Sequence, residues 1–568
     1  MIRKLFGYLF LISLPFYQVA FAQSISLNGN WNFVASNTLS EAEVLKADYS
    51  TWDTLHVPGN WDTRQRYASH VGKGYYQRNL VIPKKWKGKQ IRIKFEAVYE
   101  TSKVWLNGEL IGEHIGGYLP FTFNLTKYLK AEGNNSLVVM ADNTYKRGAW
   151  WAWGGISREV RLMANEEVRL VYQHISSVPD FVKNEVNFTI KYAIENNGLS
   201  SKTVQIVPHF AGRNKEALLV TVNGNSTKVS ELKFKRKLTD YKLWHFKTPN
   251  LYELKSELKV NGQLVDVAVD NFGIRKFEVR GEQFFLNNQP VRMNGVNRVH
   301  DHPLYGNTEP DQLIERDMKD IKSLGCNFSR LMHAPLSKNL LDFCDKNGFL
   351  LIEEIPVWGE TDPQAFPDNP IPKKWMADMI ERDFNHPSVV AWSVGNELRK
   401  PNTPQNEKYL SAEQYAYINS MLDFVAFLDS TRLKTYVSFT GFNAGKIGTE
   451  PYEKLDFLSM NSYGGTPKVA ERLHQKFPGK PIFVSEIGIE QIGNEENASL
   501  NEKLLDNIWE LKKLPYITGV SIWTYNDYKS NYRGTPASGF REWGVVDAYR
   551  KRKEIAYKQL KDVFKEWE

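Results

Sequence analysis

The fold of this chain is decided by residues 385–397, which read NHPSVVAWSVGNE. The apolar run Val389–Val394 inside this segment has the length and the β-branched content of a buried strand. A helical pattern over Ile371–Phe384 precedes the segment, and a second one over Ser411–Asp429 follows it. A fully apolar strand between two helices is typical of parallel α/β folds, in which helices cover both faces of the sheet.

The alternation of strand and helix extends from about residue 280 to the end of the chain. The predicted strands are Arg292–Val296, Asn327–Arg330, Phe349–Ile352, Val389–Val394, Thr435–Ser438, Phe457–Met460, Pro481–Ser485 and Gly519–Trp523. The predicted helices are Asp311–Leu324, Asn339–Asn347, Ile371–Phe384, Ser411–Asp429, Val469–Lys476, Leu500–Lys513 and Glu554–Trp567. This pattern predicts an eight-stranded α/β barrel. A doubly wound sheet is the alternative, but no strand is followed by a glycine-rich phosphate loop.

The chain before the barrel has the pattern of β-structure. Short alternating runs are separated by turn signals, and Asn-Gly pairs at 107–108, 223–224 and 261–262 indicate hairpins. We predict a β-sandwich over residues 23–167, a smaller immunoglobulin-like sandwich over 168–273 and a TIM barrel over 274–568. A short stretch at 40–47 is the one candidate helix before residue 310.

Residues 1–22 have the pattern of a secretory signal peptide. Arg3 and Lys4 precede the apolar run Leu5–Phe16, and Ala20-Phe21-Ala22 offers a cleavage site. We therefore expect an exported protein, periplasmic or secreted. We expect no membrane span, because no other stretch approaches the roughly 18 apolar residues that crossing a bilayer requires.

Composition excludes several classes of function. The 568 residues include 73 Lys and Arg against 65 Asp and Glu, and these charges are dispersed rather than clustered. The net charge of +8 therefore does not indicate the clustered basic surface that a nucleic-acid-binding protein needs. Cys326 and Cys344 are too few for a disulfide framework and are predicted to be buried thiols.

Polar residues follow several of the predicted barrel strands directly. In α/β barrels the active site forms at the C-terminal ends of the strands. The residues at these positions are Arg330, His333, Asn396, Glu397, Asn461, Tyr463, Glu486, Trp523 and Asp527. We therefore expect their side chains to converge on one mouth of the barrel.

Two carboxylates, Glu397 and Glu486, each follow a buried strand. Cleavage of a glycosidic bond requires one carboxyl group that is protonated and one that is ionised. Burial and mutual repulsion separate the pKa values of such a pair and so create the two roles. The alternative for each glutamate is a structural role, as a helix cap or in an ion pair with an arginine.

The motifs of this chain resemble those of glycoside hydrolase family 2, the group of β-galactosidases, β-glucuronidases and β-mannosidases. Residues 385–397 resemble the acid/base signature of the family, and PIFVSEIG at 481–488 resembles its nucleophile segment. GVNR at 295–298 resembles the start of the first barrel strand of the family. VWLNG at 104–108 and GGISR at 154–158 resemble its jelly-roll sugar-binding domain, and FGIR at 272–275 resembles its junction into the barrel.

The resemblance implies a retaining mechanism, with Glu486 as nucleophile and Glu397 as proton donor and acid/base. It implies that Asn396 binds the sugar 2-hydroxyl, that Arg330 and Tyr463 hold Glu486 ionised, that His333 contacts the sugar and that Trp523 forms a stacking floor. Asp527, Trp151 and Arg541 complete the predicted substrate-binding set. Loops such as 146–151, with Trp150 and Trp151 side by side, shape the pocket in this family and would make the enzyme exo-acting.

Three departures from the family pattern limit the prediction of the substrate. Val299 stands where the family usually has histidine, so His300, Asp301 and His302 are candidates for the missing contact. The stretch 358–360 reads WGE, which does not support the magnesium site of some β-galactosidases, and we expect no metal or other cofactor. The Asn-x-Lys clamp of β-glucuronidases is missing, and Lys529, Arg533 and Arg541 are candidates to bind an anionic group, unless they belong to a solvated loop.

The sequence therefore predicts a retaining exo-β-glycosidase that hydrolyses terminal β-linked sugars, a β-glucuronide or a β-galactoside, from polysaccharide-derived oligosaccharides. The alternatives are a β-mannosidase or another β-glycosidase of the family, an endo-acting hydrolase or transglycosidase, and a non-catalytic carbohydrate-binding protein. The expected partner is the oligosaccharide substrate, and a homo-oligomer is left open.

Overall fold

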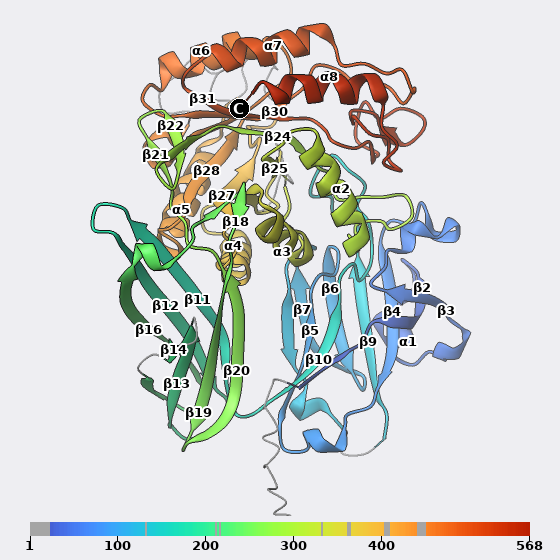
Figure 1. The fold of residues 1–568 in the computed structure, drawn as a ribbon. Coiled ribbons are helices and arrows are strands. Elements are labelled where there is room, and N and C mark those ends of the chain that lie inside the picture. The colour runs from blue at the N-terminus through green and yellow to red at the C-terminus, as the bar shows by residue number, and fades with distance from the viewer. Residues whose placement is uncertain are drawn as a thin grey trace, which may run out of the picture.

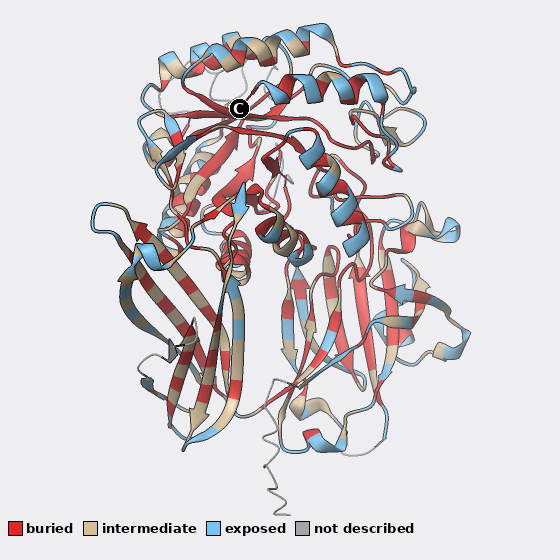
Figure 2. Ribbon diagram, in the orientation of Figure 1, coloured by how far each residue is buried: buried red, intermediate tan, exposed pale blue. Residues whose placement is uncertain are grey.

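The computed structural model describes residues 23–130, 133–210, 213–214, 217–330, 333–359, 365–402, 409–439 and 450–567, and the predicted signal peptide lies outside this part. An α/β barrel lies at one end of the molecule, and two β-sandwiches lie side by side beneath it (Figure 1). Buried residues are concentrated in the barrel strands and alternate mainly with residues of intermediate burial along strands of the second sandwich such as those over 168–180 and 185–196 (Figure 2). The predicted fold class, two β-domains followed by a TIM barrel, is confirmed.

The first sandwich packs two antiparallel sheets face to face. One sheet has the order β1 (Gln23–Ser26), β10 (Val160–Asn165), β5 (Gln90–Phe95) and β8 (Phe121–Asn124). The other has the order β3 (Asp53–Val57), β2 (Gly29–Ala35), β4 (Lys73–Leu80), β9 (Asn135–Asp142), β6 (Thr101–Leu106) and β7 (Glu109–Ile115). Large aromatic side chains such as Trp31, Phe33 and Trp61 fill the space between the sheets. Helix α1 (Glu41–Leu45) lies within the predicted stretch 40–47 and begins with a capping box formed by Ser40 and Glu43.

The second sandwich has the same construction with fewer strands. One sheet has the order β11 (Val168–Asp180), β12 (Glu185–Asn196) and β16 (Ser226–Lys237). The other has the order β14 (Arg213–Asn214), β13 (Lys202–Phe210), β19 (Tyr252–Val260) and β20 (Gln263–Phe272), and β15 (Leu218–Val222) also pairs with β13. Alternate residues of β12, among them Val186, Phe188 and Ile190, are buried in the core. This period of two is what the alternating sequence pattern predicts.

The third unit is a closed barrel of eight parallel strands, which excludes the doubly wound alternative. The strands are β24 (Met293–Asn297), β25 (Phe328–Arg330), β26 (Leu350–Glu354), β27 (Val389–Asn396), β28 (Leu433–Ser438), β29 (Leu458–Ser462), β30 (Ile482–Ile487) and β31 (Ile517–Ile522). The helices are α2 (Asp311–Ser323), α3 (Lys338–Asn347), α4 (Pro370–Asp383), α5 (Ala412–Leu428), α6 (Thr466–Lys476), α7 (Glu502–Lys513) and α8 (Glu554–Lys565). Cys326 and Cys344 are free and buried, as predicted.

Four barrel strands, β26, β27, β29 and β30, extend two residues further at their C-terminal ends than the sequence predicts. The apolar pattern stops before these ends because the last residues of the strands are polar. They nevertheless remain paired with the neighbouring strands of the barrel, as Glu354 is with Ser393 and Asn461 is with Glu486. The prediction therefore ends each strand just before the residues that line the mouth.

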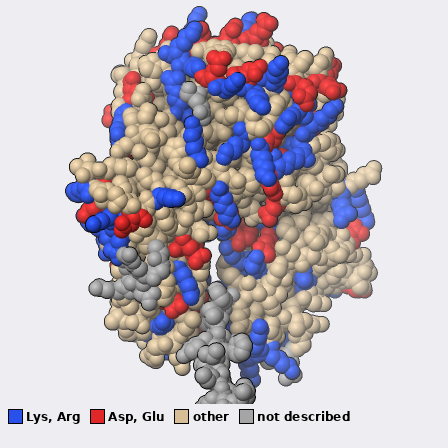
Figure 3. Space-filling view, viewed as in Figure 1, with Lys and Arg blue, Asp and Glu red and all other residues tan. Residues whose placement is uncertain are grey.

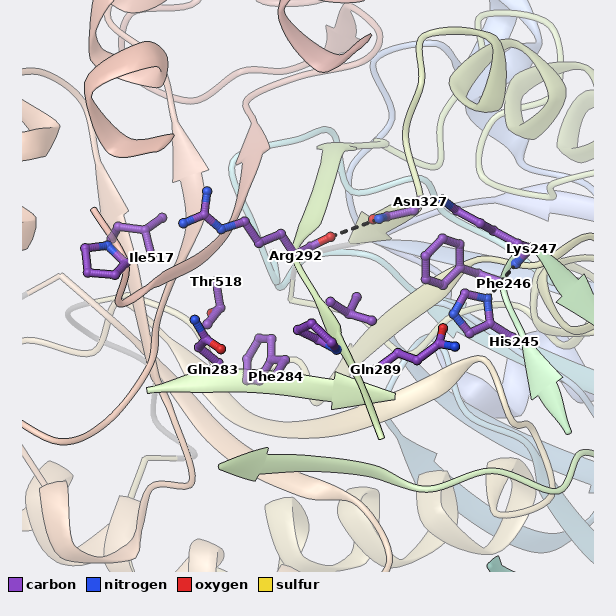
Figure 4. A pocket seen from close by; sticks show the side chains of 13 residues that line it. His245, Phe246, Lys247, Gln283, Phe284, Gln289, Arg292, Asn327, Ile517 and Thr518 are labelled. Carbon is purple, nitrogen blue, oxygen red and sulfur yellow. Dashed lines mark hydrogen bonds between the residues drawn. The ribbon is translucent and has the colours of Figure 1, made fainter. Parts of the chain in front are cut away.

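The opposite end of the barrel is closed by a small sheet of β21 (Phe277–Arg280), β22 (Gln283–Leu286) and β23 (Gln289–Val291). A pocket of about 340 Å³ lies there, lined by residues of this sheet and by residues next to the starts of the barrel strands (Figure 4). Asn327 Nδ2 donates a hydrogen bond of 2.9 Å to the Arg292 carbonyl beside it. This end of a barrel serves stability rather than chemistry, so the pocket is separate from the mouth.

The segment 385–389 also joins the barrel to the second sandwich. Asn385 Oδ1 accepts a hydrogen bond of 2.8 Å from Ile175 N in β11, and Asn385 Nδ2 donates one of 2.8 Å to Gln173 O. Arg275 donates to the carbonyls of Pro387 and Val389 at the start of β27. The first residues of the segment thus fix the domain arrangement, whereas its last residues line the mouth.

Helix α4 contacts both sandwiches (Figure 1). Trp375 Nε1 donates a hydrogen bond of 2.8 Å to the carbonyl of Ile115 in the first sandwich. His174 Nε2, in the second sandwich, lies 3.0 Å from the carbonyl of Glu381 in this helix. The barrel therefore rests on both β-domains through one helix and the strand that follows it.

The surface carries charges of both signs. Lys and Arg side chains are interspersed with Asp and Glu side chains on the face shown in Figure 3. Within the described ranges, no helix combines the length and the apolar character that a membrane crossing needs.

We predict that Asn385→Ala weakens the junction between the barrel and the second sandwich. The substitution leaves the Ile175 N–H and the Gln173 carbonyl without their side-chain partners, which costs about 1–3 kcal/mol. Thermal unfolding should shift to lower temperature, and hydrogen exchange of the Ile175 amide should accelerate. Asn124→Ala, which removes exposed hydrogen bonds in β8, is the control. An Ile175 amide that exchanges equally slowly in both variants would contradict the assigned role.

Candidate active site

A distortion at the end of β27 places Asn396 and Glu397 at the mouth. The pairing of β27 with β28 shifts its register between Ser393 and Asn396, which is the pattern of a β-bulge. Gly395 in this bulge has φ 152°, and a Cβ there would lie 3.1 Å from the carbonyl of Val357. Glu397 follows with φ 53°, an uncommon conformation for a residue with a side chain. Bulges re-aim side chains beside active sites, which is the role of this one.

Glu486 lies near the end of β30 and has a partner on each carboxylate oxygen. Arg330 Nη1 donates to Oε1 at 2.8 Å, and the Tyr463 hydroxyl donates to Oε2 at 2.5 Å. Burial and the charge of Glu486 raise the pKa of Tyr463 well above its usual value, so its hydroxyl keeps the proton that it donates. Both carboxylate oxygens of Glu486 therefore accept hydrogen bonds, one from a guanidinium and one from a phenol.

Glu397 has the opposite environment. Burial and the negative charge of Glu486 raise the pKa of Glu397 above its ordinary value. Asn461 Nδ2 donates to its Oε1 at 2.9 Å, and Arg399 lies 3.6 Å from its Oε2. The side chain is 15% exposed, so the group is open to a ligand at the mouth. One carboxyl group of the pair is thus favoured in its protonated form.

The Asn396 amide lies between these two carboxyl groups. Its Oδ1 accepts hydrogen bonds from Arg330 Nη2 at 2.9 Å and from Asn461 Nδ2 at 3.2 Å. Its buried Nδ2 donates to no described residue. Because an unpaired buried donor is costly, this amide is suited to donate to a hydroxyl of a bound substrate.

A third carboxylate, Glu354, is buried beside the pair and was not among the predicted site residues. Its oxygens accept from Arg330 Nη2 at 3.0 Å, from His333 N at 2.7 Å and from Ser393 Oγ at 2.6 Å, and His333 Nδ1 lies 3.1 Å away. Burial alone would raise its pKa, but the Arg330 charge and these hydrogen bonds lower the pKa of Glu354 to about 2. Its signal in the sequence is its position two residues after the predicted strand Phe349–Ile352, because other site residues also lie at or just after strand ends.

Trp150, in the loop 146–153 of the first sandwich, reaches the mouth. Its indole stacks on the His333 ring at 5.3 Å between ring centres, and His333 stacks on Trp358 at 5.5 Å. Trp151 points elsewhere, since its Nε1 donates to Asp62 at 2.7 Å and its ring lies 4.2 Å from Lys529 Nζ. Of the two adjacent tryptophans, Trp150 contacts a site residue, and Trp151 anchors the loop.

Trp523 follows β31 directly, and Arg541 lies next to Tyr532, whose ring contacts Trp358 at 5.7 Å. Trp523 contacts the Tyr528 ring edge-on at 5.9 Å, and Tyr528 pairs with Arg541 between β32 (Tyr528–Lys529) and β33 (Phe540–Arg541). The Arg541 guanidinium lies 5.7 Å from the Tyr532 ring and 5.9 Å from Trp543. Trp543 in turn contacts Tyr463, the tyrosine that donates to Glu486, with 5.7 Å between the ring centres. The Trp543 ring therefore contacts both Arg541 and Tyr463.

The remaining charged candidates have other partners or positions. Asp527 Oδ1 accepts from Lys553 Nζ at 2.9 Å and from Gly544 N at 2.8 Å, so its contacts hold the C-terminal segment against the barrel. Lys529 donates to the Ala68 carbonyl at 3.1 Å and lies over Trp151. Arg533 is exposed, next to Tyr532. Neither Arg533 nor Arg541 makes a hydrogen bond or ion pair with a described residue, but Arg541 differs from the exposed Arg533 in having a buried Nε without a partner.

The three residues after Val299 lie in different environments. His300 is buried against the edges of Tyr118 and Trp150, and burial lowers its pKa to about 4. The Asp301 carboxyl accepts from Lys529 N at 2.8 Å, and burial raises its pKa to about 7. His302 packs on Tyr305 at 4.9 Å. Of the three, His300 contacts the tryptophan that stacks on His333.

A metal site finds no support in the described part of the chain. There, no three or more His, Cys, Asp or Glu side chains are grouped so that they could hold an ion. Glu360, in the stretch 358–360, lies outside the described residues.

Three family models match consecutive parts of the chain. "Glycosyl hydrolases family 2, sugar binding domain" matches residues 25–166, and "Glycosyl hydrolases family 2" matches residues 171–275. "Glycosyl hydrolases family 2, TIM barrel domain" matches residues 277–533. The three ranges correspond to the two sandwiches and to most of the barrel.

Individual relatives are distant. A β-glucuronidase of Bacteroides fragilis is 25% identical over 98% of this chain and 83% of that protein, and a β-galactosidase of Bacteroides ovatus is 28% identical over 81% and 58%. The chain covers 58% of the length of the Bacteroides ovatus protein and 46% of the length of a Formosa agariphila relative. It therefore spans about half of the length of some relatives. The crystal structure of a Bacteroides uniformis β-glucuronidase matches with a TM-score of 0.84 and 25% identity over 95% of this chain and 69% of that one. The matching domain models, the barrel and the strand-end carboxyl groups together show that the chain belongs to glycosyl hydrolases family 2.

Proposed function

We propose that the protein is a retaining exo-β-glycosidase that removes terminal β-linked sugars from oligosaccharides. The observation that carries the proposal is the contrast between Glu486, whose two oxygens accept from Arg330 and Tyr463, and Glu397, whose pKa is raised by burial and by Glu486. Glycosidases need one ionised and one protonated carboxyl group at the same bond. The names of the relatives, β-glucuronidase and β-galactosidase, support the same class of reaction.

The two groups divide the reaction between them. Glu486 attacks the anomeric carbon and forms a glycosyl ester while the bond to the leaving oxygen breaks, and Glu397 donates its proton to that oxygen. In the second step, Glu397 takes a proton from water, the water oxygen bonds to the anomeric carbon, and Glu486 leaves as a carboxylate. Asn396 Nδ2 is available to bind a sugar hydroxyl during both steps.

Arg541 favours a sugar that carries a carboxylate, so a β-uronide is the first substrate candidate and a β-galactoside the second. Its guanidinium has aromatic neighbours but no anionic partner among the described residues. An arginine in this setting can bind a carboxylate through two parallel hydrogen bonds. Exo action is supported by the Trp150, His333 and Trp358 stack, in which a loop of the first sandwich covers one side of the mouth. The signal-peptide pattern of residues 1–22 suits an enzyme that meets its oligosaccharides after export.

We predict that Glu486→Gln lowers the turnover of every β-glycoside by a factor of at least about 10³, because the variant lacks the carboxylate that forms the glycosyl ester. The loss should not depend on the leaving group, and it is measured with a panel of nitrophenyl β-glycosides. Glu490→Gln, an exposed glutamate in the loop after the same strand, removes the same charge and should leave turnover near that of the wild type. Substantial activity in Glu486→Gln would refute the nucleophile assignment.

For Glu397→Gln we expect a loss that depends on the leaving group. General acid catalysis contributes about 10²–10⁴-fold, but nitrophenolate departs without a proton whereas an alcohol does not. Hydrolysis of an alkyl or sugar glycoside should therefore fall much further than the release of nitrophenolate. The wild type should lose activity at high pH as Glu397 deprotonates, and this alkaline limb should be absent from the variant. Equal losses for both leaving groups would contradict the acid role.

Arg541→Gln tests the substrate class. If Arg541 binds the sugar carboxylate, kcat/KM for a nitrophenyl β-uronide should fall roughly 10- to 100-fold, as expected for a lost charge-assisted hydrogen bond. The value for the β-galactoside should barely change. Arg533→Gln is the matched control, because it removes an exposed guanidinium next to the same Tyr532 ring. A wild type that hydrolyses the β-galactoside alone would show that Arg541 has no role in recognising an anion.

A further inference from the structure

We propose that Glu354 is a positioning residue that keeps Glu397 protonated, by supplying a second fixed negative charge to the arginine shared with Glu486. This inference rests on the proposed glycosidase function. It concerns a residue that bears no direct part in the two chemical steps but contacts the groups that do.

The contacts of Glu354 place its charge at the centre of the site. Arg330 donates through Nη1 to Glu486 and through Nη2 to Glu354 and to Asn396. One guanidinium therefore serves two carboxylates and the amide next to Glu397. Arg330 and Glu354 are both fully buried, so little water screens their interaction.

Glu354 also fixes His333. It accepts a hydrogen bond from the His333 backbone N–H, and His333 Nδ1 lies 3.1 Å from the same oxygen. An ionised carboxylate can only accept, so the nearby Nδ1 carries a ring proton. His333 has φ 57°, and its ring lies between Trp150 and Trp358, so this carboxylate helps to hold both its backbone and its ring.

The titratable and charged groups around Glu397 come from several elements of the barrel. They are Arg330 and His333 at and after β25, Glu354 in β26, Arg399 after β27, Tyr436 in β28, Tyr463 after β29 and Glu486 in β30. With Glu397 protonated, the two guanidinium groups balance the two ionised carboxylates. Removal of the Glu354 charge leaves an excess positive charge near Glu397, which favours the loss of its proton.

The neighbouring residue Glu353 offers a contrast on the same strand. Its Oε1 accepts from Leu336 N at 3.0 Å, and its side chain faces Arg382 and Asp383 at the end of α4. Burial and the charge of Asp383 raise the pKa of Glu353 well above its ordinary value, which favours its protonated form. Glutamine is nearly isosteric with that uncharged form.

The test compares Glu354→Gln with Glu353→Gln. The readout is the alkaline limb of kcat/KM for an alkyl β-glycoside that the wild type hydrolyses, because an alcohol leaving group needs the proton of Glu397. Glu354→Gln should move this limb to lower pH by at least about half a unit, besides lowering kcat, because a buried neighbouring charge is lost. Glu353→Gln should leave the limb in place. For a variant too slow to assay, the protonation of Glu397 is followed by its carboxyl band in infrared difference spectra against the corresponding Glu397→Gln variant.

Glu354→Asp separates charge from geometry. It keeps the negative charge but shortens the side chain, so the limb should stay in place while kcat falls. This variant also decides the matter if Glu354→Gln does not fold, because a shifted limb or an unchanged kcat in Glu354→Asp would overturn the proposal. An unmoved limb in folded Glu354→Gln would overturn it as well and reduce Glu354 to a structural role. A wild type without activity on any β-glycoside would instead refute the proposed function.

Discussion

The arrangement of the mouth depends on the buried guanidinium of Arg330. A cation removed from water must be compensated by anions and acceptors, and here Glu486, Glu354 and Asn396 provide them. The three partners come from three different strands of the barrel, β30, β26 and β27. One residue thus fixes the relative positions of the nucleophile candidate, the third carboxylate and the amide beside Glu397.

The same cluster explains how two glutamates in one site acquire different properties. Glu486 is close to the cation and accepts from Tyr463, whereas Glu397 contacts Asn461 directly and has Arg399 only at 3.6 Å. Burial then acts on Glu397 with less compensation, and the negative Glu486 adds to the effect. The difference between the two carboxyl groups is therefore a property of their surroundings rather than of the residue type.

The β-domains take part in the site through contacts far from the catalytic pair. Trp151 and Asp62 hold the loop 146–153, and the loop brings Trp150 against His333. The second sandwich is joined to the start of β27 through Asn385 and Arg275. Because β27 ends at Asn396, directly before Glu397, the strand that leads to Glu397 is anchored at one end and bulged at the other.

The sequence by itself determined the three units, the barrel and the two strand-end glutamates, because apolar periodicity and strand ends are local features of the chain. The tertiary structure alone decided that Glu354 joins them, that Trp150 rather than Trp151 contacts His333, and that Asp527 is paired with Lys553. It also showed Arg541 between two aromatic rings without an anionic partner in the described residues. These outcomes depend on which side chains from distant segments meet, and on the burial and charge that each then experiences. No spacing within the chain records that information.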